Sequence, residues 1–287
     1  MTNELQPHTL DEALEIRAAR PDAVPVAGGT DLMVALNAAH EPPPALLDLS
    51  RVAVLQDWHR DGGSVFVGAG VTFARIGREL ASFRPLAEAA RSVGSHQIRN
   101  RATIGGNIAT ASPAGDSLPV LAAYGATIVL ASVSRERRVP WGAFFVGPKR
   151  TTLAPDELVT GVEWPVVGAP GSFAKVGTRN AMVIAIANVC VQLDPDARAV
   201  RLALGSVAPT VVRAFDAEAF ASAEVGWDDP ERPLPTPVCV EFGRLAAVAA
   251  RPIDDVRGSA AYRRLAVDVL AQRALRWTFS DLREARC

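Results

Sequence analysis

Glycines and short polar side chains, which can bind a phosphate through N–H and hydroxyl groups, concentrate in two stretches of this chain. The stretches are PVAGGTD (residues 25–31) and TIGGNIATASPAGD (residues 103–116). Adjacent glycines cost conformational entropy, so they indicate unusual backbone angles or a large group pressed against the backbone. Two separated stretches of this kind could hold the two halves of a dinucleotide pyrophosphate.

The first stretch reads as a short buried strand that runs into a glycine turn and then into a helix. This order places Gly28, Gly29 and Thr30 at the N-terminus of the helix. Backbone N–H groups at such a position form a concave donor array for an anion. A strand-to-helix turn with nothing bound fits the same residues equally well.

The second stretch adds side chains suited to the same kind of ligand. Thr103, Asn107, Thr110 and Ser112 supply short donors and acceptors, and Asp116 can accept hydrogen bonds from ribose or ribityl hydroxyls. An array of polar β-turns is the alternative interpretation. The number of convergent polar groups favours a ligand-binding loop.

The cysteines, histidines and serines of the chain lack the spacing that a metal site or a catalytic nucleophile would require. The cysteines are far apart without a CxxC pair, and the histidines show no metal-ligand spacing, which argues against a disulfide framework and against an iron–sulfur or zinc site built by this chain alone. No GxSxG nucleophile elbow is present. Any redox chemistry must then use a bound organic cofactor or a group on another chain. The residues concerned are Cys190, Cys239, Cys287, His8, His40, His59 and His96.

The composition is that of a globular protein. The chain has 287 residues, 49% of them hydrophobic, with 30 Lys and Arg against 31 Asp and Glu. This balance argues against a broad nucleic-acid footprint. No apolar run reaches membrane-spanning length, and the N-terminal segment lacks a secretory signal pattern, so we expect a cytoplasmic protein without a membrane span.

Local signals predict the elements that position these stretches. Thr9 and Glu12 form a capping box at the start of a first helix. The segment VFVGAGVTF (residues 65–73) resembles a dinucleotide-binding fingerprint, but Phe73 stands where the third glycine belongs, so a tight strand-to-helix turn is favoured.

The sequence pattern in the second half of the chain predicts successive strands followed by helices. The segment MVIAIANVCVQLD (residues 182–194) predicts one strand, with alternation at 183, 185, 187 and 189. Three helices are expected to start near Arg213, Val238 and Ser259. Strands and helices in separate blocks indicate an α+β fold. The segment VVGAPG (residues 166–171) is a plausible domain boundary.

Five segments together resemble the FAD-binding medium subunit of the molybdenum hydroxylases, the family of the xanthine and carbon monoxide dehydrogenases. They are PVAGGTDL, VGAGVT, QIRNRATIGGNIATASPAGDSLPVLAAYGA, KVGTRNAMVIAIANV and PIDDVRGSAAYRRLAVDVLAQRAL, in the family's order. The resemblance implies a vanillyl-alcohol-oxidase-like FAD-binding domain over residues 1–168, with α+β subdomains of about 1–58 and 59–168. A smaller α+β domain, an antiparallel sheet with helices, is implied over residues 169–287.

The resemblance also implies which residues bind the cofactor. Residues 26–30 and 103–107 would form two pyrophosphate-facing loops, Thr110 and Asp116 would lie on the ribityl and ribose side, and Val159 and Lys175 would lie near the flavin ring. Val93 stands where some members place an aromatic ring against the flavin, and the segment after Arg179 is apolar where several carry an acidic residue. The full implied set is Val26, Ala27, Gly28, Gly29, Thr30, Asp31, Ala102, Thr103, Ile104, Gly106, Asn107, Thr110, Asp116, Val159 and Lys175.

The implied function is electron transfer within a heteromeric enzyme. A large molybdopterin-binding subunit would carry the molybdenum cofactor and a small subunit two [2Fe-2S] clusters, in a dimer of heterotrimers. FAD on this chain would pass electrons to NAD+, a quinone or O2. The sequence of residues 175–189 resembles the xanthine dehydrogenase-like branch of the family more than the carbon monoxide branch. The alternatives are a carbon monoxide or aromatic/heterocycle dehydrogenase subunit, a stand-alone flavoprotein oxidoreductase, and a nucleotide-binding structural or assembly module.

Overall fold

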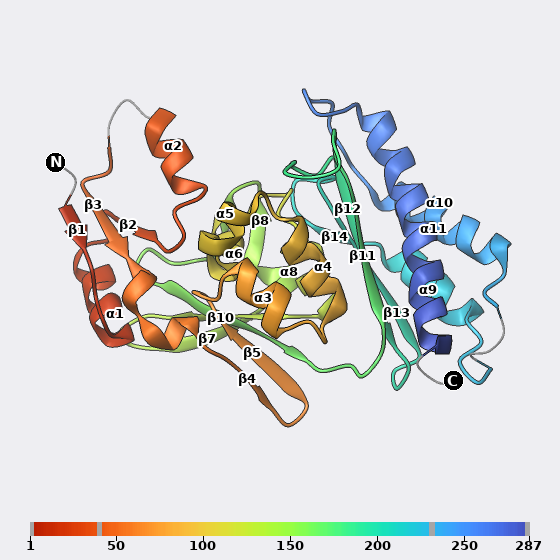
Figure 1. Cartoon of the computed structure of the whole chain (residues 1–287), viewed down its shortest axis with the longest axis horizontal. Helices are drawn as coiled ribbons and strands as arrows, with labels where there is room; N and C mark the ends of the chain where they lie inside the picture. Colours follow the sequence, from red (N-terminus) through yellow and green to blue (C-terminus); the bar gives the residue numbers. More distant parts are fainter. Residues whose placement is uncertain (1–2, 39–41, 230–232, 285–287) are drawn as a thin grey trace.

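The chain folds into three α+β regions that follow one another along the sequence (Figure 1). This computed structural model describes residues 3–38, 42–229 and 233–284. His40 and Cys287, both named above, lie outside the described residues. Within those ranges, no helix is both long enough and apolar enough to cross a lipid bilayer. The expected α+β layering is confirmed.

The N-terminal region, at the left of Figure 1, is a small parallel sheet with two helices. Its strands lie in the order β1-β3-β2, and both pairings are parallel. The predicted capping box is confirmed, since Thr9 Oγ1 accepts from the Glu12 N–H and Glu12 accepts from the Thr9 N–H. The elements are β1 (Asn3–Leu5), α1 (Leu10–Ala19), β2 (Ala23–Val26), α2 (Leu32–Ala38), β3 (Ala45–Asp48) and two 3-10 turns (Leu49–Arg51 and Ala53–Gln56).

The central region is an antiparallel sheet of strand order β4-β5-β10-β6-β7, with helices packed on it. Helices α6 and α7 contact the middle strand β10, so the main apolar core lies between the sheet and these helices. The strands are β4 (Trp58–Asp61), β5 (Ser64–Gly68), β6 (Thr127–Ala131), β7 (Glu136–Pro140) and β10 (Leu158–Pro165), with a small hairpin of β8 (Phe145–Gly147) and β9 (Arg150–Thr151). The helices are α3 (Phe73–Glu79), α4 (Arg84–Ser92), α5 (His96–Arg101), α6 (Ile104–Thr110), α7 (Ser117–Tyr124) and α8 (Trp141–Phe144).

The C-terminal region is an antiparallel sheet of order β11-β12-β13-β14, covered by three helices at the right of Figure 1. Helix α11 contacts β11 and β12 on one face, and α4 and α7 of the central region contact β11 to β13. The sheet is therefore sandwiched between two helical layers. The elements are β11 (Gly171–Val176), β12 (Ala187–Asp194), β13 (Ala199–Gly205), β14 (Val212–Arg213), α9 (Phe215–Glu224), α10 (Thr236–Ala249) and α11 (Ala260–Glu284).

One predicted strand was wrong in its extent and in its pattern. The strand β12 begins only at Ala187, and residues 182–186 form part of the connection that precedes it. All eight residues of β12 are buried, so the expected alternation of buried and exposed positions is absent. The reason is that both faces of this central strand are covered by helices, and a doubly covered strand reads as a continuous apolar run.

An ion pair within α3 is hydrogen-bonded to the first strand of the central sheet. Arg75 Nη2 lies 2.8 Å from Glu79 Oε2, and the same carboxylate accepts from Trp58 Nε1 at 3.1 Å. These donors, Arg75 first, lower the pKa of Glu79 from its ordinary 4.5 to about 2. The folded state therefore favours the ionised carboxylate.

This shift predicts a loss of stability in acid. The contribution of Glu79 is fully present above its unfolded pKa near 4.5 and is lost as the pH falls toward 2. Because the side chain is partly solvated, we expect Glu79→Gln to lower the free energy of unfolding by about 1–2 kcal/mol at pH 7 and to flatten the dependence below pH 4.5. Urea unfolding at pH 7, 4 and 3 measures both effects. An equal loss at all three pH values would contradict the prediction.

Candidate functional site

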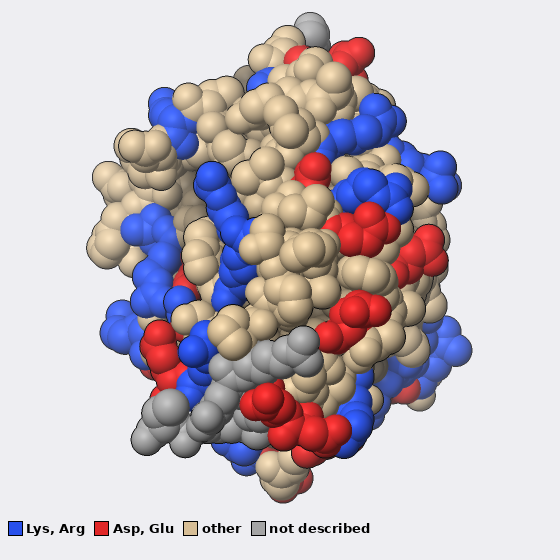
Figure 2. All heavy atoms as spheres, turned by 90° about the vertical axis from the view of Figure 1, so that its right-hand side faces the viewer, with Lys and Arg blue, Asp and Glu red and all other residues tan. Residues whose placement is uncertain are grey.

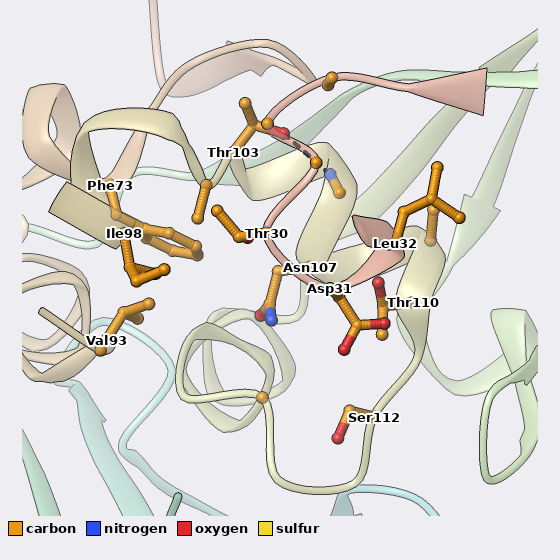
Figure 3. Close-up of a pocket in the computed structure, with 18 of the residues that line it drawn as sticks. Thr30, Asp31, Leu32, Phe73, Val93, Ile98, Thr103, Asn107, Thr110 and Ser112 are labelled. Atoms are coloured by element: carbon orange, nitrogen blue, oxygen red, sulfur yellow. Dashed lines mark hydrogen bonds between the residues drawn. The ribbon is translucent and has the colours of Figure 1, made fainter. Parts of the chain in front are cut away.

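A cavity of about 550 Å³ opens where the β2–α2 turn faces helices α5 and α6. Figure 3 shows Phe73, Val93 and Ile98 close together at one end of it. Thr110 and Ser112 lie toward the other end (Figure 3). The volume is in the range of small-molecule and cofactor sites. The cavity therefore offers an apolar end for a flat ring and a polar end for hydroxyl or phosphate groups.

The β2–α2 turn presents unused backbone donors to this cavity. Within the described residues, the N–H groups of Gly28, Gly29, Thr30 and Asp31 have no hydrogen-bond acceptor. All four residues line the cavity. Gly29 has φ +73°, a backbone conformation that glycine adopts without strain. Successive free N–H groups in a turn form an anion-binding concavity.

The second predicted loop is in fact the start of a helix, which corrects the interpretation of residues 103–107 as a loop. Thr103 is the N-cap of α6, and its hydroxyl accepts from the Gly106 N–H at 3.1 Å. The N–H groups of Ile104, Gly105 and Asn107 donate to Val71, Ala69 and Thr103 carbonyls. The backbone donors of this stretch are therefore already used, so its side chains, not its backbone, are available to a ligand.

Two of the glycines are explained by chain packing. A Cβ on Gly28 would lie 2.1 Å from the Arg101 carbonyl oxygen, and a Cβ on Gly105 would lie 2.3 Å from Ala69 Cβ. The absence of a side chain lets the β2–α2 turn lie against the end of α5, and lets α6 lie against the turn after β5. A Cβ on Gly106 would meet only Thr103 Oγ1, at 3.1 Å, and Gly106 lines the cavity.

Asp116 is held in a buried network that reaches the C-terminal sheet. Its Oδ2 accepts from Lys175 Nζ at 2.5 Å and from the Ser92 hydroxyl at 3.1 Å, and its Oδ1 accepts from Asn188 Nδ2 at 3.0 Å. Burial raises the pKa of the Asp116 carboxyl, and the Lys175 ammonium opposes part of that rise. Asp116 lines the cavity, so the network links the cavity to β11 and β12.

Asn188 is therefore expected to stabilise the junction between the regions. In Asn188→Ala a buried carboxylate loses one of its donors, which should lower the free energy of unfolding by about 1–3 kcal/mol. Chemical denaturation measures the loss. The matched control is Ser172→Ala on the neighbouring strand, because the buried Ser172 hydroxyl has no hydrogen-bond partner. Equal losses in the two variants would show that the Asp116 network carries no special stability.

The structure brings most of the predicted site residues into the cavity wall and leaves three outside it. Ile104 points into the apolar core of the central region, and Val159 is buried in the same core on β10. Lys175 lines an adjoining cavity and reaches this one only through Asp116. The residues that do line it are Val26, Ala27, Gly28, Gly29, Thr30, Asp31, Ala102, Thr103, Gly106, Asn107, Thr110 and Asp116.

Sequence reasoning missed most of the apolar wall. Phe73 occupies the third glycine position of the incomplete fingerprint, and residues 182–184 belong to a segment whose pattern predicts a strand. Of this wall, Val93 alone had a signal, its position relative to an aromatic residue in the family. The lining residues that were not predicted include Leu32, Phe73, Val93, Ile98, Met182, Val183 and Ile184.

Within the described residues, no group of three or more His, Cys, Asp or Glu side chains is placed to hold a metal ion. Cys190 is buried, and burial raises the pKa of its thiol, which disfavours the nucleophilic thiolate. The chemistry that this site can perform from its own side chains is therefore binding and orientation of a ligand.

Two family models match successive parts of the chain. The FAD binding domain in molybdopterin dehydrogenase matches residues 1–167. The CO dehydrogenase flavoprotein C-terminal domain matches residues 172–278.

Sequence relatives carry names of dehydrogenase and hydroxylase subunits. The glyceraldehyde dehydrogenase medium chain of Sulfolobus acidocaldarius is 32% identical over 274 residues, covering 93% of this chain and 95% of that one. The nicotine 6-hydroxylase medium subunit of Paenarthrobacter nicotinovorans is 31% identical and covers 94% of each chain. The nicotinate dehydrogenase FAD-subunit of Eubacterium barkeri is 34% identical over 190 residues, and that match spans 64% of its length.

Solved structures share the whole architecture. A chain of quinoline 2-oxidoreductase from Pseudomonas putida 86 superposes with a TM-score of 0.88 at 26% identity, covering 99% of this chain and 98% of that one. A chain of the Cu,Mo-CO dehydrogenase superposes with a TM-score of 0.87 at 26% identity, covering 97% and 98%.

Proposed function

The chain belongs to the FAD-binding subunits of the molybdenum hydroxylases, and from this premise we propose that it holds FAD in the cavity beside the β2–α2 turn and transfers electrons within an assembled oxidoreductase. The observation that carries the placement is the row of free N–H groups from Gly28 to Asp31. These donors line a cavity that also has an apolar end at Phe73, Val93 and Ile98 (Figure 3).

The residues present fit this cofactor. The N–H groups of residues 28–31 would hold the pyrophosphate, because they are the unsatisfied donors of the cavity wall. Phe73, Val93 and Ile98 would cover a flat ring and keep water from it (Figure 3). FAD, when bound, supplies the capacity to take up electrons singly and release them in pairs, while the protein supplies binding, orientation and electrostatics.

The polar side chains of the cavity wall would bind the other oxygen atoms of the cofactor. Thr30, Asn107 and Thr110 line the polar part of the cavity and would bind phosphate or ribityl oxygens. The Asn107 Oδ1 already accepts from the Ser117 hydroxyl at 2.7 Å, so its amide N–H₂ is oriented as a donor. Asp116 Oδ1 accepts only from Asn188, which leaves it capacity for one sugar hydroxyl.

Electron transfer requires partner subunits. A large molybdopterin-binding subunit and a small iron–sulfur subunit, which the family membership implies, would supply substrate oxidation and the path to the flavin. We propose a dimer of such heterotrimers. Within the family, we assign the chain to the xanthine dehydrogenase-like branch on the basis of the sequence of residues 175–189. The nicotine, nicotinate and quinoline enzymes among the relatives make a heterocycle dehydrogenase the specific alternative.

The assembly and the isolated chain should behave differently. We expect about one noncovalent FAD per chain, no substrate turnover by the isolated chain, and flavin reduction by substrate only in the complex. Absorbance spectra of both preparations, with xanthine, nicotinate or carbon monoxide added under anaerobic conditions, test this. Turnover by the isolated chain would favour a stand-alone flavoprotein, and a colourless chain that takes up no FAD would refute the proposed function.

A further inference from the structure

Two segments without regular secondary structure contribute to the wall of the cavity. Residues 182–184 belong to the connection between β11 and β12, and residues 112–116 join α6 to α7. Within the described residues, no backbone N–H of residues 177–185 donates a hydrogen bond. The connection after β11 therefore depends on contacts at its ends for a defined conformation.

A buried arginine on α11 contacts the backbone beside both segments. The outer face of the C-terminal region carries exposed basic side chains (Figure 2), but Arg263 is only 3% exposed. Its Nη1 donates to the Ile186 carbonyl oxygen at 2.5 Å and to the Ser206 carbonyl oxygen at 2.8 Å. Ile186 is the last residue before β12, and Ser206 directly follows β13. One guanidinium therefore joins two turns that lie far apart in the sequence.

The N–H groups of the same two residues continue the link toward the cavity. The Ile186 N–H donates to the Val176 carbonyl oxygen at 2.8 Å and so closes the base of the connection. The Ser206 N–H donates to the Pro113 carbonyl oxygen, also at 2.8 Å. Pro113 lies in the stretch 112–116, whose other residues line the cavity. Each wall segment is thus tied to Arg263 through a single backbone residue.

Both turns contain a backbone conformation that has to be held in place. Met182 has φ +51° and Ser206 has φ +65°, in the left-handed region that residues other than glycine rarely adopt. Such conformations persist only where the surrounding contacts determine them. The hydrogen bond from Arg263 acts on Ser206 itself, and its other bond fixes the end of the connection that contains Met182.

The position of the Arg263 guanidinium is itself fixed by Asp255. Arg263 Nη2 donates to Asp255 Oδ1 at 2.7 Å, and that oxygen also accepts from the Arg257 N–H at 2.8 Å and the Gly258 N–H at 3.3 Å. These bonds, that of the Arg257 N–H first, lower the pKa of Asp255, so it remains an ionised partner. A buried ion pair adds little stability compared with an apolar replacement, so its geometry matters more than its energy.

We propose that Arg263 is a positioning residue of the cavity, which sets residues 182–184 and residues 112–116 relative to each other. Arg263 lines neither this cavity nor the adjoining one, so it acts only through the Ile186 and Ser206 backbone. The consequence for FAD rests on the proposed function: the tie shapes the wall against which the cofactor would lie.

Two substitutions at this position and one control separate positioning from stability. Arg263→Met removes the donors and leaves an apolar chain of moderate length. Arg263→Lys keeps a charge beside Asp255, but an ammonium lacks the planar fork that reaches the carboxylate and both carbonyl oxygens together. Leu275→Ala is the control, because Leu275 is fully buried in the apolar core of the C-terminal region on the same helix. It lowers stability by leaving a cavity, without contact to either turn.

Amide hydrogen exchange of the FAD-free full chain measures the tie directly. In Arg263→Met we expect the Ile186 and Ser206 N–H groups to exchange about tenfold faster relative to the amides of the β12–β13 ladder. Arg263→Lys should give a smaller increase, and Leu275→Ala should leave the relative rates unchanged. Unchanged relative rates in Arg263→Met would overturn the proposal.

FAD binding measures the consequence for the cofactor. Fluorescence titration should show about tenfold weaker binding in Arg263→Met than in the parent, and the visible circular dichroism of the bound flavin should change. Leu275→Ala should keep the parent affinity and spectrum at a temperature where it is folded. An affinity loss no greater than in Leu275→Ala, with the parent spectrum, would show that Arg263 does not position the cavity wall for the cofactor.

The two measurements also separate this inference from the proposed function. A parent chain that binds no FAD would contradict the proposed function. The exchange rates of the Ile186 and Ser206 amides would still decide whether Arg263 orders the two segments.

Discussion

Replacing Gly106 by valine is expected to weaken FAD binding about 100-fold while leaving the apo chain folded. A Cβ at this position meets one side-chain atom, Thr103 Oγ1, at 3.1 Å, and a shift of this hydroxyl by a few tenths of an ångström accommodates it. Gly106 lines the cavity, so the added methyl groups would occupy space that the proposed cofactor needs. Helix α6 tolerates valine because replacing a glycine regains conformational entropy that a β-branched residue only partly loses.

Two measurements separate binding from folding. Flavin content per chain and fluorescence titration of the apo chain report affinity, and thermal unfolding of the apo chain reports stability. Gly142→Val is the matched control, because Gly142 is also helical, lies outside the cavity, and a Cβ there meets nothing within 4 Å. Undiminished FAD content in Gly106→Val would show that α6 does not face the cofactor.

The regular elements were predictable because they depend on neighbours in sequence. Thr9 with Glu12 and Thr72 before α3 are caps, and a cap is decided by residues three positions apart. The strand β12 was less predictable. Its burial on both faces depends on α7 and α11, which lie far away in the chain, and no local pattern reports that.

In the candidate site, too, local features were predictable from the sequence and tertiary contacts were not. The PVAGGTD turn is predicted to be a source of backbone donors, and the N–H groups of residues 28–31 are free within the described residues. The donors of the second stretch were predicted in the same way, but tertiary bonds to Ala69 and Val71 use them. The composition of these two glycine-rich stretches shows that large side chains are absent from them. Whether a ligand or another chain segment takes their place is decided only by the three-dimensional packing.

Gly28 and Gly105 illustrate that limit. The spacing suggested that the glycines make room for a dinucleotide, and for Gly106 the cavity is consistent with this. Gly28 instead makes room for the Arg101 carbonyl, and Gly105 for Ala69. Glycine therefore serves chain packing at Gly105 and borders the cavity at Gly106, one position apart on α6, and substitutions at these two positions should separate packing from ligand binding.

Gly105→Ala is accordingly expected to cost the fold at least about 3 kcal/mol, although alanine is smaller than the valine tolerated at the next position. Its Cβ would lie 2.3 Å from Ala69 Cβ, 2.6 Å from Ala69 Cα and 2.7 Å from the Ala69 carbonyl oxygen. Helix α6 cannot move away without breaking the Gly105 N–H bond to that carbonyl, at 2.9 Å, and the Ile104 N–H bond to Val71, at 3.0 Å.

A second substitution locates the clash. Ala69→Gly removes only the nearest of the three contacts, so the double variant Ala69→Gly/Gly105→Ala should recover part of the lost free energy and not all of it. Urea unfolding of the two single variants and the double variant gives the coupling energy. Zero coupling would mean that Gly105 is required for a reason other than its contact with Ala69. A Gly105→Ala chain as stable as the parent would instead show that α6 can shift, and the separation of folding from FAD binding between Gly105 and Gly106 would then fail.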